Sequence, residues 1–338
     1  MVNSGLEAWL TRQWQHPDGW QFLLRPLSWL YGAAVAIRRL LYRYGLLVTH
    51  RLPVPVVVIG NVSVGGTGKT PLAIWLASEL DRCGWHAGIL IRGYGGSAHT
   101  PQAVNADSDP AIVGDEAIVL AQATGLPVWC GADRAQSGRA LLAAHPQVRV
   151  LICDDGLQHL ALARDCELAL IDGKRGFGNG HLLPAGPLRE PLARLDRVDA
   201  VIVHGTMPPA QQSSRWPQQF TMQLETHALY NLKFPERRLA ITQLHDQPLH
   251  AVAGIGHPER FFSQLRATGL QFIAHPFPDH HPYRAEELNF PGTILMTAKD
   301  AVKCRDFATE KMWVWPVSAR PDAGLLDLVL LKLEQHHG

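Results

Sequence analysis

Residues 54–77 constrain the fold more than any other stretch, because they combine a strand-like run, a glycine-rich turn and the start of a helix. They read VPVVVIGNVSVGGTGKTPLAIWLA. The run Val54–Ile59 follows Pro53 and is apolar and β-branched, which predicts a buried parallel strand. Pro71 lies in the first turn of the helix-like pattern that follows, where its missing N–H costs little. This order of elements is typical of a loop that binds a polyphosphate.

The turn fits most of the motif G-x-x-x-x-G-K-[ST], with Ser63 at the position of the first glycine. Its glycines let the backbone curl so that N–H groups point toward phosphate oxygens. We expect Lys69 to neutralise the β- and γ-phosphates and the Thr70 hydroxyl to ligate Mg²⁺. A turn in a Rossmann-like fold without a nucleotide is a weaker alternative. The expected nucleotide contacts are Ser63, Val64, Gly65, Gly66, Thr67, Gly68, Lys69 and Thr70.

A second apolar run supplies the carboxylates that such a loop needs for its metal. Val148–Cys153 ends in Asp154 and Asp155. Adjacent residues at a strand end face opposite sides, so one carboxylate can face metal-bound water and the other a neighbouring group. An exposed Asp-Gly turn is the alternative interpretation. We predict an Mg²⁺ site made of Thr70, Asp154 and Asp155, and the sequence leaves open which aspartate contacts the metal.

Composition limits the classes of protein to consider. The chain has 338 residues, 46% of them hydrophobic, which is enough for two domains or one large one. A net charge of +1 gives no basic excess that would favour nucleic acid. The five cysteines are odd in number and form no C-x-x-C pair, which argues against a disulfide framework or a zinc cluster and fits a reducing cytosol. The first residues lack the plan of a signal peptide, so we expect no export.

An apolar segment near the N-terminus is interrupted by arginines. Between Arg25 and Arg38 there are only twelve uncharged residues, whereas a spanning helix needs about 20. On a helix over Phe22–Leu47, apolar side chains gather on one face and arginines with small polar residues on the other. Aromatic rings and arginines suit a helix that lies in a membrane surface near anionic headgroups. A helix packed on the protein's own core is about equally compatible. The apolar face holds Leu27, Leu30, Ala34, Ile37 and Leu41, and the polar strip holds Arg25, Ser28, Gly32, Arg39 and Arg43.

Strand-like runs then alternate with helix-like ones, which predicts an α/β fold with a mostly parallel sheet and helices on both faces. The expected strands are 86–91, 127–130, 148–153, 168–171 and 200–204, and the expected helices are 71–83, 115–123 and 134–144. We divide the chain into a membrane-association segment (1–50), a nucleotide-binding domain (51–206), a linker with a two-stranded hairpin (207–245) and a smaller α/β lobe (246–338). Two lobes around a cleft suit a phosphotransferase that closes on its substrate.

Eight motifs in sequence order make the interpretation more specific. They are IGNVSVGGTGKTP, IRGYGG, VGDEA, DDGLQH, DGKRGFGNGHLLPAGPLREP, GIGHPERFF, PDHHPY and TAKDAVK. Together, between Phe22 and Lys303, they closely resemble the tetraacyldisaccharide 4′-kinases, the lipid A 4′-kinases of Gram-negative bacteria. The resemblance implies ATP and Mg²⁺ as cofactors. It also implies transfer of the γ-phosphate to the 4′-hydroxyl of a tetraacylated glucosamine disaccharide 1-phosphate at the cytoplasmic face of the inner membrane.

The resemblance also implies roles for individual residues. Asp115 matches the family's proposed catalytic carboxylate, and we expect it to act as the base. His280 matches the histidine that pairs with this carboxylate across the two lobes. Ala117 stands where the family usually has proline. Substrate or site-network roles are implied for Gln158, Arg189 and Glu190.

Several features remain open. Arg92 and Arg134 are equally compatible with anion contacts and with surface salt bridges. Lys299 either contacts the lipid's phosphate or marks a strand end and helix start. Three histidines at positions 275, 280 and 281 lie in a proline-interrupted stretch that does not favour zinc. A membrane-recruited P-loop NTPase that acts as a switch is the alternative function, and a small-metabolite kinase with its N-terminal helix packed internally is a third. Oligomeric state is not predicted.

Overall fold

The computed structural model describes residue 14 and residues 19–98, 100–226, 228–244 and 248–335. Among these residues, nine strands form one sheet with the order β15-β8-β7-β6-β1-β5-β2-β4-β3. Its pairs are parallel except for β3–β4 and β15–β8. The strands are β1 (Val56–Gly60), β2 (Ala87–Ile91), β3 (Gln102–Val104), β4 (Val128–Cys130), β5 (Val150–Asp154), β6 (Cys166–Asp172), β7 (Ala200–His204), β8 (Gln219–Thr226) and β15 (Val317–Pro321).

Helices cover both faces of this sheet, because successive residues of its central strands are apolar and point to opposite faces. Val57 and Ile59 of β1 share one core with α3, α5 and α9, whereas Val56 and Val58 share another with α6. The strands are buried on both sides and therefore lack the polar alternation of an exposed sheet. The predicted α/β class is confirmed. The helices are α3 (Lys69–Arg82), α4 (Pro110–Val113), α5 (Asp115–Thr124), α6 (Arg134–Ala144) and α9 (Gly324–Glu334).

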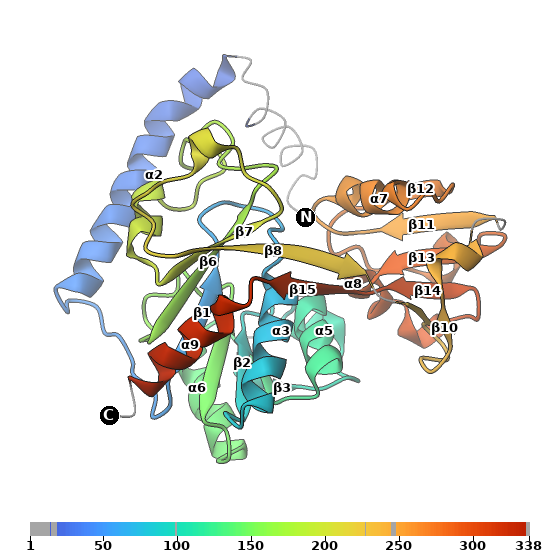
Figure 1. The fold of residues 1–338 in the computed structure, drawn as a ribbon, viewed down its shortest axis with the longest axis horizontal. Coiled ribbons are helices and arrows are strands. Elements are labelled where there is room, and N and C mark those ends of the chain that lie inside the picture. The colour runs from blue at the N-terminus through green and yellow to red at the C-terminus, as the bar shows by residue number, and fades with distance from the viewer. Residues whose placement is uncertain (1–13, 15–18, 99, 227, 245–247, 336–338) are drawn as a thin grey trace.

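A second, smaller sheet lies beside the first (Figure 1). In the described part of the chain its order is β10-β9-β14-β13-β11-β12, with parallel pairing from β14 to β12. Two apolar clusters pack on its two faces. Its strands are β9 (Leu229–Asn231), β10 (Arg238–Leu239), β11 (Leu249–Ala253), β12 (Ile273–Pro276), β13 (Thr293–Thr297) and β14 (Met312–Trp315), and its helices are α7 (Pro258–Ala267) and α8 (Ala298–Ala301).

The boundaries expected after residue 206 differ from the observed sheets. The segment 207–245 does not form a separate linker, because β8 joins the first sheet while β9 pairs with β10 in the second. Nor do residues 246–338 form one lobe, because β15 pairs with β8 and α9 packs in the core of the first sheet. Consecutive strands therefore change sheet twice in the described part of the chain, between β8 and β9 and between β14 and β15.

The N-terminal helix α2 (Trp20–Arg43) runs along the outside of the first sheet's unit, away from the second sheet (Figure 1). It ends earlier than expected, just before Gly45, which has a positive φ of 71°. Its orientation is inverted relative to an ordinary surface helix, because Ser28 is buried whereas Leu27, Leu30 and Ile37 are exposed. No described helix is long and apolar enough to cross a membrane.

Polar contacts attach α2 to the rest of the protein. Ser28 Oγ donates to the Leu182 carbonyl at 2.8 Å, and a Cβ on Gly32 would meet the Leu182 side chain at 2.9 Å. The Tyr31 hydroxyl donates to the Arg189 carbonyl at 3.0 Å. The interpretation of α2 as a helix packed through its apolar face is therefore wrong, since its polar strip contacts the protein and its apolar face points outward.

Candidate active site

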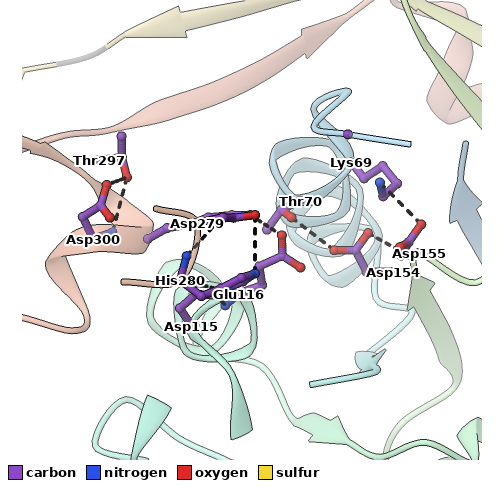
Figure 2. Close-up of polar contacts among 12 residues, drawn as sticks. Lys69, Thr70, Asp115, Glu116, Asp154, Asp155, Asp279, His280, Thr297 and Asp300 are labelled. Atoms are coloured by element: carbon purple, nitrogen blue, oxygen red, sulfur yellow. Dashed lines mark hydrogen bonds and ion pairs between the residues drawn. The ribbon is translucent and has the colours of Figure 1, made fainter. Parts of the chain in front are cut away.

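The glycine-rich loop lies between β1 and α3. Gly65 and Gly68 have φ near +100°, which side chains other than glycine rarely adopt. Lys69 Nζ lies 3.4 Å from Asn61 Oδ1 and 3.4 Å from Asp155 Oδ1. The Thr70 hydroxyl donates to Asp154 Oδ2 at 3.3 Å. The structure thus brings the predicted phosphate-binding lysine and the predicted metal-site residues together (Figure 2).

The two aspartates at the end of β5 have different environments. Asp154 is fully buried, and burial together with the negative charge of Glu116 raises its pKa to about 7. Burial would also raise the pKa of Asp155, but Lys69 and Arg189 hold it below its usual value. Arg189 Nη1 lies 3.3 Å from both carboxylate oxygens of Asp155. Asp155 is therefore already paired with two cations, whereas Asp154 carries a charge that burial disfavours.

The donor set at Thr70 and Asp154 fits Mg²⁺. Both groups offer oxygen, and a cation would favour the ionised form of Asp154 that burial opposes. Within the described ranges, no three His, Cys, Asp or Glu side chains surround one metal position. Mg²⁺ usually takes one or two carboxylates and completes its shell with water and substrate phosphates, so a small protein ligand set is sufficient here.

Asp115 and His280 meet from the two different sheets. Asp115 begins α5 directly after Gly114, and His280 follows β12 in the second sheet. His280 Nδ1 lies 3.0 Å from Asp115 Oδ2. Asp115 is 3% exposed, whereas the His280 side chain is 25% exposed. The pairing expected from the family resemblance is thus present in the geometry.

The charges of this pair influence each other. The hydrogen bond to Asp115 raises the pKa of His280. Burial opposes ionisation of Asp115, but the His280 hydrogen bond and two lysines hold its pKa below the usual value. Those lysines are Lys299, which pairs with Glu116, and Lys303, whose Nζ lies 3.9 Å from Asp115 Oδ2. Lys299 lies in α8 directly after β13, so the strand-end interpretation holds for it.

The remaining predicted site residues form a network between this site and α2. Gln158 Nε2 donates to the Asn61 carbonyl and to Glu190 Oε1, both at 2.9 Å. Glu190 is buried and also pairs with Arg39 of α2 at 3.8 Å. Through Arg189 and the Tyr31 hydroxyl, the same network reaches Asp155. Gln158, Arg189 and Glu190 therefore link the helix α2 to the carboxylates of the site.

Three basic side chains from other segments contact the glycine-rich loop, and the sequence did not reveal them. Arg260 of α7 donates to the Gly66 carbonyl at 3.0 Å and to Asp172 Oδ2 at 3.3 Å. His257 and Arg175 lie against Gly65, as the short contacts of a Cβ built there indicate. Burial, with Arg175 and Arg260 nearby, lowers the pKa of His257 to about 4. The motif GIGHPERFF contains His257 and Arg260. The sequence does not show that this motif lies near the glycine-rich loop, because that depends on how the second sheet packs against the first.

A cavity of about 550 Å³ opens beside Arg175, lined by residues of the glycine-rich loop and of the segment after β6. Ser63, Val64 and Thr67 line it on one side, and Asp172 and Arg175 on the other. The two other arginines considered from sequence are elsewhere. Arg134 is buried and donates to the carbonyls of Gly131 and Ala132, so it is not a surface salt bridge, and Arg92 is exposed.

The family model and the relatives described here carry the same description. The family model for tetraacyldisaccharide-1-P 4′-kinase matches residues 20–334. A tetraacyldisaccharide 4′-kinase from Methylobacillus flagellatus is 51% identical over 335 residues, 98% of each chain. One from Azoarcus sp. is 48% identical over 330 residues, covering 96% of this chain and 95% of the relative. The crystal structure of LpxK from Aquifex aeolicus in complex with ATP superposes with a TM-score of 0.77 at 29% identity, covering 93% of this chain and 99% of that one.

Proposed function

Because the chain belongs to the tetraacyldisaccharide 4′-kinase family, we propose that it transfers the γ-phosphate of ATP to the 4′-hydroxyl of a tetraacylated glucosamine disaccharide 1-phosphate, a step of lipid A biosynthesis. One observation of this chain carries the proposal. His280 of the second sheet pairs with Asp115 of the first sheet's unit, which also carries Lys69 and the Thr70–Asp154 pair. Glu116, which follows Asp115, acts electrostatically on Asp154, so the two halves of the site lie within reach of each other.

The glycine-rich loop supplies the nucleotide side of the reaction. Its backbone N–H groups and Lys69 hold the β- and γ-phosphates, and Arg260 stabilises the loop from the second sheet through the Gly66 carbonyl. Thr70 and Asp154 would hold Mg²⁺, which adds positive charge next to the phosphates. Positioning and electrostatic stabilisation account for most of phosphoryl-transfer catalysis, and this chain offers both around one loop.

The acceptor hydroxyl must lose a proton while its oxygen bonds to the γ-phosphorus and the bond to the β–γ bridging oxygen breaks. We expected Asp115 to take that proton, but its side chain is only 3% exposed, its Oδ1 accepts the Glu116 N–H at 2.8 Å and its Oδ2 pairs with His280. The His280 side chain is 25% exposed. We therefore assign the proton to Nε2 of His280, with Nδ1–H donating to Asp115. Asp115 then orients the ring and stabilises the imidazolium that forms.

The acceptor is a membrane lipid, and α2 suits its delivery. The outward face of α2 exposes Leu27, Trp29, Leu30 and Ile37, while its inward face contacts the network around Asp155. Burial of such a face in a lipid–water interface is favourable, and arginines near it attract anionic headgroups. We propose that the protein binds peripherally to the cytoplasmic face of the bacterial inner membrane through α2.

Label transfer from [γ-³²P]ATP tests this function. With Mg²⁺ and the tetraacylated disaccharide 1-phosphate in mixed micelles, we expect labelled lipid that depends on the acceptor. Label released only as free phosphate, at the same rate without lipid, would reject the kinase and favour the membrane-recruited NTPase that acts as a switch.

A further inference from the structure

Lys303 occupies an unusual position behind the Asp115–His280 pair. Its side chain is 7% exposed, and its Nζ lies 3.0 Å from Asp300 Oδ1, 3.3 Å from the Gly254 carbonyl and 3.9 Å from Asp115 Oδ2. One buried ammonium group therefore faces two carboxylates from different sheets. Burying an ammonium group is costly unless it is paired. The three polar partners of Lys303 therefore indicate a specific role.

The Lys303–Asp300 pair hydrogen-bonds both backbone polar groups of Gly254, its N–H and its carbonyl. The N–H of Gly254 donates to Asp300 Oδ1 at 3.1 Å, and its carbonyl accepts from Lys303 Nζ. The same carbonyl accepts the backbone N–H of His280 at 3.2 Å. A Cβ at position 254 would lie 2.6 Å from the Tyr283 hydroxyl, which itself donates to Asp300 at 2.9 Å. Gly254 is thus fixed from several sides, and His280 is attached to it.

His280 needs such support because its backbone is strained. Its φ is +57°, in the left-handed region that residues with a side chain occupy at a cost. Such a conformation persists where the surroundings determine it. The Gly254 carbonyl that fixes its N–H is held by Lys303, and the carboxylate that fixes its ring lies beside the same ammonium group.

We propose that Lys303 is a positioning residue for the transfer reaction, which places the His280 backbone through Gly254 and sets the charge balance of the Asp115–His280 pair. The inference depends on the proposed role of His280 as base. Lys303 is placed to act through Asp115, because its Nζ and His280 Nδ1 both approach Asp115 Oδ2, at 3.9 Å and 3.0 Å.

The other charged groups near the Asp115–His280 pair come from α5, from α8 and from the histidine's own loop. Glu116 of α5 is paired with Lys299 of α8, and Asp279 lies 3.8 Å from His280 Nε2 on the histidine's own loop. Asp300 is fully buried and is bonded by Thr297 and Tyr283 in addition to Lys303. Removing the Lys303 cation would leave these groups in place and make protonation of the coupled pair more favourable. At this separation a unit charge shifts a neighbouring titration by about one pH unit.

The test is the pH dependence of kcat for label transfer to lipid in Lys303→Gln, which keeps a hydrogen-bond donor and loses the charge. We expect the acidic limb of the profile to move up by about one pH unit, with kcat reduced about tenfold at pH values on that limb and KM for ATP within about twofold of the unchanged protein. Lys303→Arg retains the cation, so its acidic limb should stay in place even where kcat falls. Lys332→Met, which breaks the remote pair with Asp199, is the control and should keep the unchanged profile.

Two results would overturn the inference. One is a lower kcat at every pH for Lys303→Gln with an unmoved acidic limb, as a purely structural role would give. The other is an equal upward shift in Lys303→Arg, which would exclude the charge as the cause. His280→Ala separates this inference from the proposed function. Near-normal transfer in His280→Ala would reject the base assignment itself, whereas loss of transfer there with an unmoved limb in Lys303→Gln would reject only the role of Lys303.

Discussion

Replacing the outward apolar residues of α2 should release the protein from membranes without unfolding it. The variant Trp29→Gln/Leu30→Gln/Ile37→Gln removes side chains that are 73%, 68% and 56% exposed. Full burial of such a side chain is worth about 1.5–3 kcal/mol, and these exposed fractions scale it to about 1–2 kcal/mol each. The three together contribute about 3–6 kcal/mol of membrane affinity, which is roughly a hundredfold to about ten-thousandfold in partitioning. Stability in water should change little, because the side chains contact solvent in the folded protein.

The assay is co-sedimentation with vesicles that contain anionic phospholipid, accompanied by a thermal melt. Ile273→Gln on β12 is the matched control, since its side chain is 60% exposed but belongs to the second sheet, at the other end of the molecule from α2 (Figure 1). The control should sediment with vesicles as the unchanged protein does. Equal sedimentation of the triple variant would refute the assignment of α2 as the membrane-binding surface. A large fall in melting temperature would show that these side chains pack against protein.

Three further outcomes follow from the site. Lys69→Ala should lower kcat/KM for label transfer about 10²–10³-fold, as expected for loss of one cation at the transferring phosphate, and unchanged kinetics would remove the glycine-rich loop from the chemistry. Because Asp154 has a pKa raised to about 7 and must be ionised to bind metal, the apparent Mg²⁺ affinity should weaken as pH falls below 7 and level off above it. Calorimetric titration with Mg²⁺ and ATP checks this, and Asp154→Asn should abolish the pH dependence. Gly60→Ala should destabilise the fold by about 1–3 kcal/mol, measured by denaturant unfolding, because its Cβ would lie 2.5 Å from Leu157 Cβ. An unchanged free energy of unfolding would contradict the close packing of β1 on the turn that contains Leu157.

Elements that depend on local pattern could be predicted from the sequence. The strand β7 and the helix α6 have the expected bounds, and β2 and α5 differ by one residue, because buried apolar runs and helical periodicity are local signals. The Asp115–His280 contact was expected only from the family resemblance, since 165 positions separate the two residues. No periodicity specifies a contact between residues that distant.

Features that depend on how distant segments meet could not be predicted. The strand β15 pairs with β8 across about ninety positions, and an alternating pattern does not say which sheet a strand joins. Arg260 and Lys303 reach the site only because the second sheet is placed against the first. For α2 the sequence defined two faces but not which one contacts the protein, because a membrane reverses the usual preference for buried apolar residues.

The most direct test of the central claim is the rate of label transfer by His280→Ala compared with Asp115→Asn, at saturating ATP and lipid acceptor. A positioned general base contributes about 10²–10⁴-fold. The account predicts that His280→Ala loses transfer by a factor in this range while ATP affinity is retained. It also predicts that Asp115→Asn loses transfer and moves the acidic limb of its pH profile to lower pH, because the pKa of His280 falls without the carboxylate. Near-normal kcat in His280→Ala would contradict the proposal that this pair, brought together from two sheets, takes the proton of the acceptor hydroxyl.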